Sequence, residues 1–283
     1  MNVINSGRTK ELENEVQRLR AELTKVKDTR DKYRAERDAD REERDKLRAA
    51  ALFARPPRGR FASRLKGEGI EIGALDKPLP VPEGVKVRYV DRRSREETMK
   101  GYTGKRDDVS KFVHNEFVCN GEKLEVIDDE TQDFVIANHM LEHCMNPIGT
   151  VKNFLRVTKP GGLLFITLPD KRYSFDYKRP ITPWEHILND YETDIEVEPI
   201  ETYEDWNQYV NPNAKPESKF KNQSNIHFHA WTMNEIVEMF SRMQSDLGFP
   251  IHLESALQAG NEVICLLRKE EFKQEHYDHP GAV

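Results

Sequence analysis

The stretch DFVIANHMLEH (133–143), followed after a helical segment by TKPGGLLFI (158–166), decides the fold of this 283-residue chain. Both stretches belong to continuous apolar runs, DFVIAN (133–138) and GLLFITLP (162–169), which are typical of parallel strands buried on both faces. We expect a helix between them over NPIGTVKNFLRVTKPGG (146–162), ended by its Pro-Gly-Gly. Strand, helix and strand in this order indicate an α/β domain.

The pattern continues on both sides of this unit. GIEIGA (69–74) and VKVRYVD (85–91) read as strands before it, and residues 231–249 read as a helix with apolar residues on one face. IHLESALQ (251–258) and EVICLLRK (262–269) are expected to be the last two strands, joined by a tight Ala-Gly-Asn turn. The α/β domain is therefore predicted to occupy residues 67–283.

The N-terminal segment has a different pattern, since residues 9–50 contain no Gly or Pro and are dense in charge. Apolar residues recur there at alternating spacings of four and three, as in the a and d positions of a coiled coil; they are Leu12, Val16, Leu19, Leu23 and Val26. We predict a coiled-coil helix over 1–52 that assembles a homo-oligomer, followed by a linker over 53–66. The alternative is a solvated single helix with charge pairs four residues apart.

Composition excludes several classes of protein. A net charge of −6 and a pI near 5.9 argue against a general nucleic-acid binder, which needs a basic face. The three cysteines have no metal-like spacing, which suggests a reducing compartment without a disulfide framework. The N-terminus lacks the apolar run of a signal peptide, and no stretch reaches the length of a membrane span. The sequence thus predicts a cytoplasmic protein with no membrane span.

Two acidic residues lie near the ends of the first two expected strands, as in sites that bind a nucleotide-like ligand. In Ile70-Glu71-Ile72-Gly73 a strand ends in a glycine that lets backbone approach a ligand. The second strand ends at Asp91, where a carboxylate can accept both ribose hydroxyls of an adenosine. Either acid taken alone is equally compatible with an ordinary surface turn.

Together, 69–91 and the motifs at 133–143 and 158–166 resemble the class I S-adenosylmethionine-dependent methyltransferases, in particular the subgroup with N-H-x-L-E-H and L-K-P-G-G-type motifs. The resemblance implies a Rossmann-like seven-stranded sheet with a reversed final hairpin, and S-adenosylmethionine as cofactor. The cofactor-binding residues that it implies are Glu71, Gly73, Asp91, Arg92, Asn120, Gly121, Asn138, His139, Leu141 and His143. The first motif has Ala74-Leu75-Asp76 where further glycines are commonest, and the adenine segment lacks the usual acid at Asn120.

The segment 170–230 is predicted to be a substrate-covering insertion, irregular and rich in Pro, aromatic and charged residues. His186 and Asp190 would share a face if PWEHILNDY is a helix, and His227 and His229 would share one side of an extended segment. Histidine titrates near neutral pH, so these four residues are the catalytic candidates, with His186 as the preferred base oriented by Asp190. Alternatively they bind a divalent ion or are structural; no metal is assigned.

The predicted function is methyl transfer from S-adenosylmethionine to a small-molecule or glycan acceptor, preferentially a sugar hydroxyl. The chain resembles methyltransferases of bacterial polysaccharide and glycoconjugate pathways, which makes glycan modification the expected role. One alternative is N- or C-methylation of a metabolite, and another is a non-catalytic Rossmann scaffold assembled by the coiled coil. NAD binding is disfavoured because G-x-G-x-x-G is absent.

Overall fold

The computed structural model describes residues 56–101 and 111–270, together with positions 15, 17–19, 23–25, 27–34 and 37–38. The chain divides into two compact units, residues 1–54 and 55–283. In the first unit the described positions are helical and exposed, with Leu19 and Leu23 each about half exposed. The remaining apolar seam positions lie outside the described residues, so pairing with a second copy stays a prediction.

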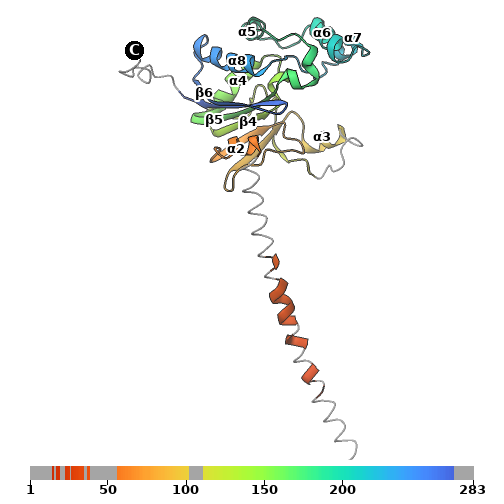
Figure 1. The fold of residues 1–283 in the computed structure, drawn as a ribbon, viewed down its shortest axis with the longest axis vertical. Helices are drawn as coiled ribbons and strands as arrows, with labels where there is room; N and C mark the ends of the chain where they lie inside the picture. Colours follow the sequence, from red (N-terminus) through yellow and green to blue (C-terminus); the bar gives the residue numbers. More distant parts are fainter. Residues whose placement is uncertain are drawn as a thin grey trace, which may run out of the picture. The chain divides into compact units, whose positions relative to one another are not determined.

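The second unit is built on a seven-stranded sheet with the order β3-β2-β1-β4-β5-β7-β6 (Figure 1). Its strands are β1 (Glu68–Ile72), β2 (Lys86–Asp91), β3 (Asn115–Val118), β4 (Gln132–Asn138), β5 (Thr158–Pro169), β6 (Ile251–Ala259) and β7 (Glu262–Lys269). The first five strands pair in parallel, whereas β7 is antiparallel to both β5 and β6. The prediction of a seven-stranded sheet with a reversed final hairpin is confirmed.

Both faces of the sheet are covered, which explains the continuous apolar runs. Val135 and Ala137 of β4 enter one core cluster with helices α4 (Pro147–Val157) and α8 (Met233–Ser245). The alternate residues Phe134 and Ile136 enter a second cluster on the opposite face. Figure 1 shows α4 and α8 on one side of the sheet, and α2 and α3 (Arg95–Gly101) on the other.

The predicted linker over 53–66 is wrong for its second half. Pro57 begins helix α2 (Pro57–Ala62) instead of ending one, because proline suits the first helical position. Ala62 and Leu65 are fully buried in the cluster below the sheet, and the Arg58 guanidinium hydrogen-bonds to the Glu262 carboxylate. The globular unit therefore starts before residue 67.

The expectation of an irregular insertion over 170–230 is also wrong. The segment contains the short 3₁₀ helices η3 (Lys171–Tyr173) and η4 (Phe175–Lys178) and the helices α5 (Trp184–Glu192), α6 (Ile200–Val210) and α7 (Pro216–Lys221). Only α5 was expected from the sequence. Tyr203, Ile226 and Phe228 form a small core of their own, so the segment is a folded layer. Similarly, α4 ends at Val157, before the Pro-Gly-Gly, because Lys159 precedes a proline and favours extended backbone.

Candidate active site

The carboxyl ends of the central strands bring the predicted cofactor residues to one edge of the sheet. The backbone N–H of Gly73, after β1, donates to the Val90 carbonyl of β2 at 2.9 Å, and the N–H of Cys119, after β3, donates to the Asp91 carbonyl at 3.0 Å. The strand order reverses between β1 and β4, where ligands of open α/β sheets bind. Gly73 has a φ of +66° and open space where a Cβ would stand, so its backbone is approachable.

Glu71 lies beneath this edge and is 1% exposed. Its carboxylate accepts hydrogen bonds from the backbone N–H of Leu79 and from the side-chain amide of Asn138, each at 3.0 Å. Burial raises the pKa of Glu71 to about 7 although these hydrogen bonds act in the opposite direction. The side-chain oxygen of Asn138 in turn accepts a hydrogen bond from the Thr167 hydroxyl at 3.2 Å. Glu71 and Asn138 thus fix the segment after β1, and their polar atoms are already bonded within the protein.

Asp91 and Arg92 lie at the tip of β2. Asp91 is partly buried, its Oδ1 accepts from the backbone N–H of Arg93 at 3.1 Å, and burial raises its pKa. Arg92 is exposed. A carboxylate held in place at a strand end can accept hydrogen bonds from ligand hydroxyls.

The segment after β3 packs closely on the first strand. A Cβ at Gly121 would stand 2.7 Å from Ile72 Cγ2 and 3.1 Å from Met140 Cε, so only glycine fits there. The side-chain oxygen of Asn120 accepts from the Glu122 N–H at 2.9 Å. Asn120 lines a cavity of about 300 Å³ with ten further residues: Glu122, Lys123, Met145, Asn146, Gly149, Thr150, Asn153, Asp194, Ile195 and Glu196.

After β4 the chain turns sharply at His139, whose φ is +49°. The imidazole lies between two carboxylates: Nε2 is 2.8 Å from Glu262 Oε2, and Nδ1 is 3.4 Å from Glu142 Oε1. Burial lowers the pKa of His139, but the hydrogen bonds and charges of both acids outweigh it and raise the pKa to about 9. His139 is therefore a cation at neutral pH. Leu141 is fully buried in the main core, so its side chain packs rather than lining a surface.

A first group of side chains, the His227 cluster, comprises Glu142, His143, Asp176 and His227. The Nδ1–H of His227 donates to Asp176 Oδ2 at 2.6 Å, while the Nδ1–H of His143 donates to the Ile226 carbonyl at 2.8 Å. The two imidazoles meet edge to face with centroids 4.6 Å apart. Glu142 is fully buried, and its Oε1 lies 4.0 Å from His227 Nε2.

Asp176 is itself held from the other side. The buried Arg179 guanidinium donates to Asp176 Oδ1 at 3.1 Å and to the His227 carbonyl at 2.7 Å. Burial works to raise the pKa of Asp176, but its hydrogen bond with His227 and the charge of Arg179 outweigh burial and lower it. Asp176 is thus an anion that fixes the His227 tautomer and leaves Nε2 as a hydrogen-bond acceptor.

A second group, the His229 cluster, comprises His186, Asp190 and His229. His186 and Asp190 are one turn apart on α5, as the sequence predicted, with His186 Nε2 3.3 Å from Asp190 Oδ2. The His229 ring stacks on Trp231 with centroids 5.0 Å apart, and its centroid is 5.7 Å from that of His186. The four predicted catalytic residues therefore divide between two clusters, with His227 in one and the other three in the second.

Three residues of these clusters, Glu142, Asp176 and Arg179, were not predicted from the sequence. Glu142 was visible inside the N-H-x-L-E-H motif, but its burial was not. Asp176 is 51 positions from His227, and no local pattern signals that pairing. The same holds for Glu262, which joins Arg58 and His139 across the sheet edge.

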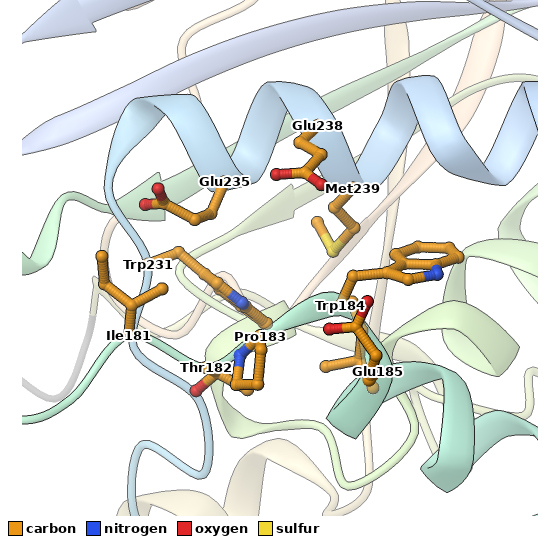
Figure 2. A pocket seen from close by; sticks show the side chains of 10 residues that line it. Ile181, Thr182, Pro183, Trp184, Glu185, Trp231, Glu235, Glu238 and Met239 are labelled. Carbon is orange, nitrogen blue, oxygen red and sulfur yellow. The ribbon is translucent and has the colours of Figure 1, made fainter.

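A pocket of about 240 Å³ lies between α5 and α8, and none of the predicted site residues lines it (Figure 2). Trp231 forms part of its wall and stacks on His229, so the pocket adjoins the His229 cluster. In Figure 2, Glu235 extends from α8 on the side of Ile181 and Trp231, whereas Glu238 extends beside Met239, above Trp184 and Glu185 of α5. Its charged lining residues are all acidic, which disfavours an anionic ligand.

Comparison with protein families decides the identity of the fold and its chemistry. The family model described as a methyltransferase domain matches residues 48–212, which is more than half of the chain. The chain belongs to the methyltransferase domain family. The protein is an S-adenosylmethionine-dependent methyltransferase, and S-adenosylmethionine is its cofactor. The resemblance drawn from residues 69–166 is confirmed at this level.

Solved structures similar to this methyltransferase share little sequence with it. One is an S-adenosylmethionine-dependent methyltransferase of Thermotoga maritima, described as a possible histamine N-methyltransferase, with 16% identity and a TM-score of 0.42 over 73% of this chain and 84% of that one. Another is an S-adenosylmethionine-dependent methyltransferase of Aquifex aeolicus, with 13% identity and a TM-score of 0.38 over 71% and 81%. No curated protein matches the sequence.

The described part of the methyltransferase contains no helix that is both long and apolar enough to cross a membrane.

Proposed function

We propose that the enzyme transfers the methyl group of S-adenosylmethionine to a hydroxyl group of a small-molecule or glycan acceptor, with His227 as the general base. The observation that carries the proposal is the 2.6 Å hydrogen bond between His227 Nδ1 and Asp176 Oδ2. A base oriented by a carboxylate is the arrangement that removes a proton from a weakly acidic hydroxyl. The sequence favoured His186 for this role, but the side chain of His186 is 47% exposed and lacks so close a carboxylate hydrogen bond.

The cofactor is proposed to bind at the carboxyl edge of β1, β2 and β4. Gly73 offers an open backbone, Asp91 and Arg92 would face the ribose, and Asn120 and Gly121 would face the adenine. His139 and His143 would lie below the sulfonium side. Because His139 is a cation paired with two acids, its charge is neutralised before a positively charged cofactor approaches. Glu71, Asn138 and Leu141 are proposed to act by holding this edge in place.

S-adenosylmethionine supplies an electrophilic methyl carbon on a sulfonium. Transfer requires the acceptor oxygen, the methyl carbon and the sulfur to lie in line, since the oxygen lone pair forms the new bond as the C–S electron pair returns to sulfur. His227 Nε2 takes the hydroxyl proton in this step, and Asp176 stabilises the resulting imidazolium. Arg179 holds Asp176 in place while the charge on the ring changes.

Exposed aromatic side chains around the base favour a sugar-like acceptor. Phe175 is 52% exposed, and its ring centroid lies 4.5 Å from that of His227. Tyr173 and Tyr177 on the neighbouring 3₁₀ turns are also more than half exposed. Aromatic faces beside a hydroxyl-directed base suit a polyhydroxylated ring, whose C–H surface stacks on them and whose oxygens reach the polar groups.

His227→Gln tests the assignment. Cofactor affinity measured by calorimetry should match that of the parent, whereas methyl transfer from labelled S-adenosylmethionine to a panel of sugars and glycosides should fall roughly 10²–10⁴-fold. A phenolic acceptor, which ionises more readily, should lose less rate than an aliphatic alcohol. Parent-like turnover of the alcohol by His227→Gln would remove His227 from the reaction. His186→Gln is the matched control and should affect both acceptors equally.

A second candidate is methyl transfer to an amine. The acidic pocket in Figure 2 has Glu185, Glu235 and Glu238 in its lining, which favours a cationic acceptor, although Arg242 lies 3.6 Å from both Glu185 and Glu238. Glu235 is partly committed already, since its carboxylate accepts from the Thr232 backbone N–H at 2.9 Å. Methylation of amines but not of hydroxyl acceptors in the same panel would favour this candidate over the first.

A further inference from the structure

The His229 cluster gathers three metal-ligating side chains from two parts of the chain. His186 and Asp190 project from α5, and His229 comes from the extended segment that precedes α8. One ligand atom of each lies within 4.8 Å of the other two. Two imidazole nitrogens and one carboxylate oxygen in this arrangement form a donor set that suits divalent transition metals.

His229 has a lone pair that nothing in the described protein uses. The residue is 1% exposed, and its Nε2–H donates to the Cys144 carbonyl at 3.0 Å, which fixes the tautomer. Nδ1 is buried and has no hydrogen-bond partner among the described residues. Metal-bound histidines usually donate their other N–H to a carbonyl or carboxylate in this way.

Asp190, on α5, likewise has a buried acceptor atom without a hydrogen bond. The residue is 4% exposed, and its Oδ2 is buried without a hydrogen bond and lies 3.3 Å from His186 Nε2. The buried nitrogen lone pair of His229 and the buried carboxylate oxygen of Asp190 are both acceptors, and ligand atoms of the two residues lie within 4.8 Å of each other. A cation between them would satisfy both.

We infer that His186, Asp190 and His229 bind a divalent transition metal, for which Zn²⁺ is the best match. Three protein ligands of N, N and O type leave a fourth tetrahedral position open. That position is reachable, because the side chain of His186 is 47% exposed. The site goes beyond the proposed methyl transfer and does not depend on the acceptor or on the role of His227.

The metal would join α5 to the strand-like segment that carries the proposed base. His227 and His229 are two residues apart, and the backbone N–H groups of Phe228 and His229 both point to the Glu142 carbonyl, at 2.7 and 3.3 Å. A metal bound to His229 would therefore also restrain the backbone between His227 and His229. Trp231, stacked on His229, extends the same connection to the pocket of Figure 2.

The His227 cluster offers a similar set in Glu142, His143 and His227, and the Glu142 oxygens also lack a hydrogen bond among the described residues, but cations face its acids. The His139 cation lies 3.4 Å from Glu142 Oε1, and Arg179 binds Asp176. A divalent ion there would be repelled by His139. The same two clusters therefore provide both the test variants and their controls.

The full-length protein, purified without chelator or a polyhistidine tag, should contain close to one equivalent of zinc by mass spectrometry. After the metal is removed, titration with Co²⁺ should give visible absorption typical of nitrogen and oxygen ligands. Asp190→Asn and His229→Gln should lose metal affinity by at least the roughly 10–100-fold that follows loss of an outer-shell partner. Glu142→Gln, the control in the other cluster, should bind the metal like the parent.

His186→Gln keeps the test independent of folding, since this side chain is half exposed and its replacement leaves the core intact. It should also lose the Co²⁺ spectrum. A parent protein that binds neither added Zn²⁺ nor Co²⁺ would overturn the inference. So would metal binding that Glu142→Gln abolishes and Asp190→Asn leaves unchanged, because the ion would then belong to the His227 cluster.

Discussion

The His227 and His229 clusters both combine two histidines with acidic side chains, and His227 and His229 are two positions apart. The charges and lone pairs of the two clusters are nevertheless balanced differently. In the first, each acid has a cation: Asp176 faces Arg179, and Glu142 faces His139. In the second, the buried Nδ1 of His229 and Oδ2 of Asp190 have no hydrogen bond among the described residues, and His186 Nε2 lies 3.3 Å from Asp190 Oδ2. The first arrangement suits transfer of a proton, and the second suits binding of a cation. Residue type alone does not separate these two chemistries.

The largest expected effect comes from replacing the acid of each cluster in turn. Asp176→Asn should reduce turnover by roughly 10²–10⁴-fold, the range for general-base catalysis, because the His227 ring loses its oriented tautomer. Its metal content should stay at the parent level. Asp190→Asn should show the reverse, with most of the metal lost and a smaller change in turnover. Steady-state kinetics and metal analysis on both variants check this, and equal losses of turnover would show that the clusters act as one site.

The ribose contact at the tip of β2 should be independent of both clusters. Asp91→Ala should weaken S-adenosylmethionine by about 1.5–3 kcal/mol, the value of charge-assisted hydrogen bonds to two hydroxyls. Asp91→Asn, which keeps one acceptor, should lose less. Calorimetric titration measures both, with metal content as the control that must not change. If Asp91→Ala binds the cofactor like the parent, the carboxylate at the tip of β2 does not hold the ribose.

A smaller effect concerns the cation that compensates the His227 cluster. The folded-state pKa of His139 is about 9, against about 6.5 in an unfolded chain. The stability that it contributes is therefore fully present below pH 6.5 and is lost as the pH rises through 9. His139→Gln should unfold with a flatter pH dependence in that window, while both proteins keep parallel slopes below it. Urea unfolding without cofactor measures this, and identical slopes across the window would mean that His139 is neutral in the folded protein.

The sheet could be predicted because its strands are buried on both faces. Continuous apolar runs such as 133–138 follow directly from that burial, and the reversed final hairpin followed from the family resemblance. Helix α2 could not be predicted, since its segment carries only a short apolar signal in Phe61, Ala62 and Leu65. Its other anchor, the pair of Arg58 and Glu262, joins positions 204 apart.

The same contrast between local sequence signals and long-range contacts applies to the site. His186 and Asp190 were predicted as neighbours because helix geometry places residues four apart on one face. The pairing of His227 with Asp176 depends on how the folded insertion returns to the sheet edge, which local spacing does not encode. Alternation alone suggested that His227 and His229 act together, whereas each has partners of its own in the structure.

The smallest effect on either cluster is expected from removal of the N-terminal unit. The chain divides after residue 54, and α2 begins at Pro57, so a protein that starts at Arg55 keeps Arg58 and its bond to Glu262. Cofactor affinity, metal content and turnover should then match the full-length enzyme. If residues 9–50 form the proposed coiled coil, light scattering should give a lower subunit number for the shortened protein.

A protein that starts at residue 67 is the contrasting variant: it also loses Ala62 and Leu65 from the core and should be less stable. An unchanged subunit number in the Arg55 protein would assign assembly to the globular unit, and a loss of activity there would show that the N-terminal helix contributes to catalysis.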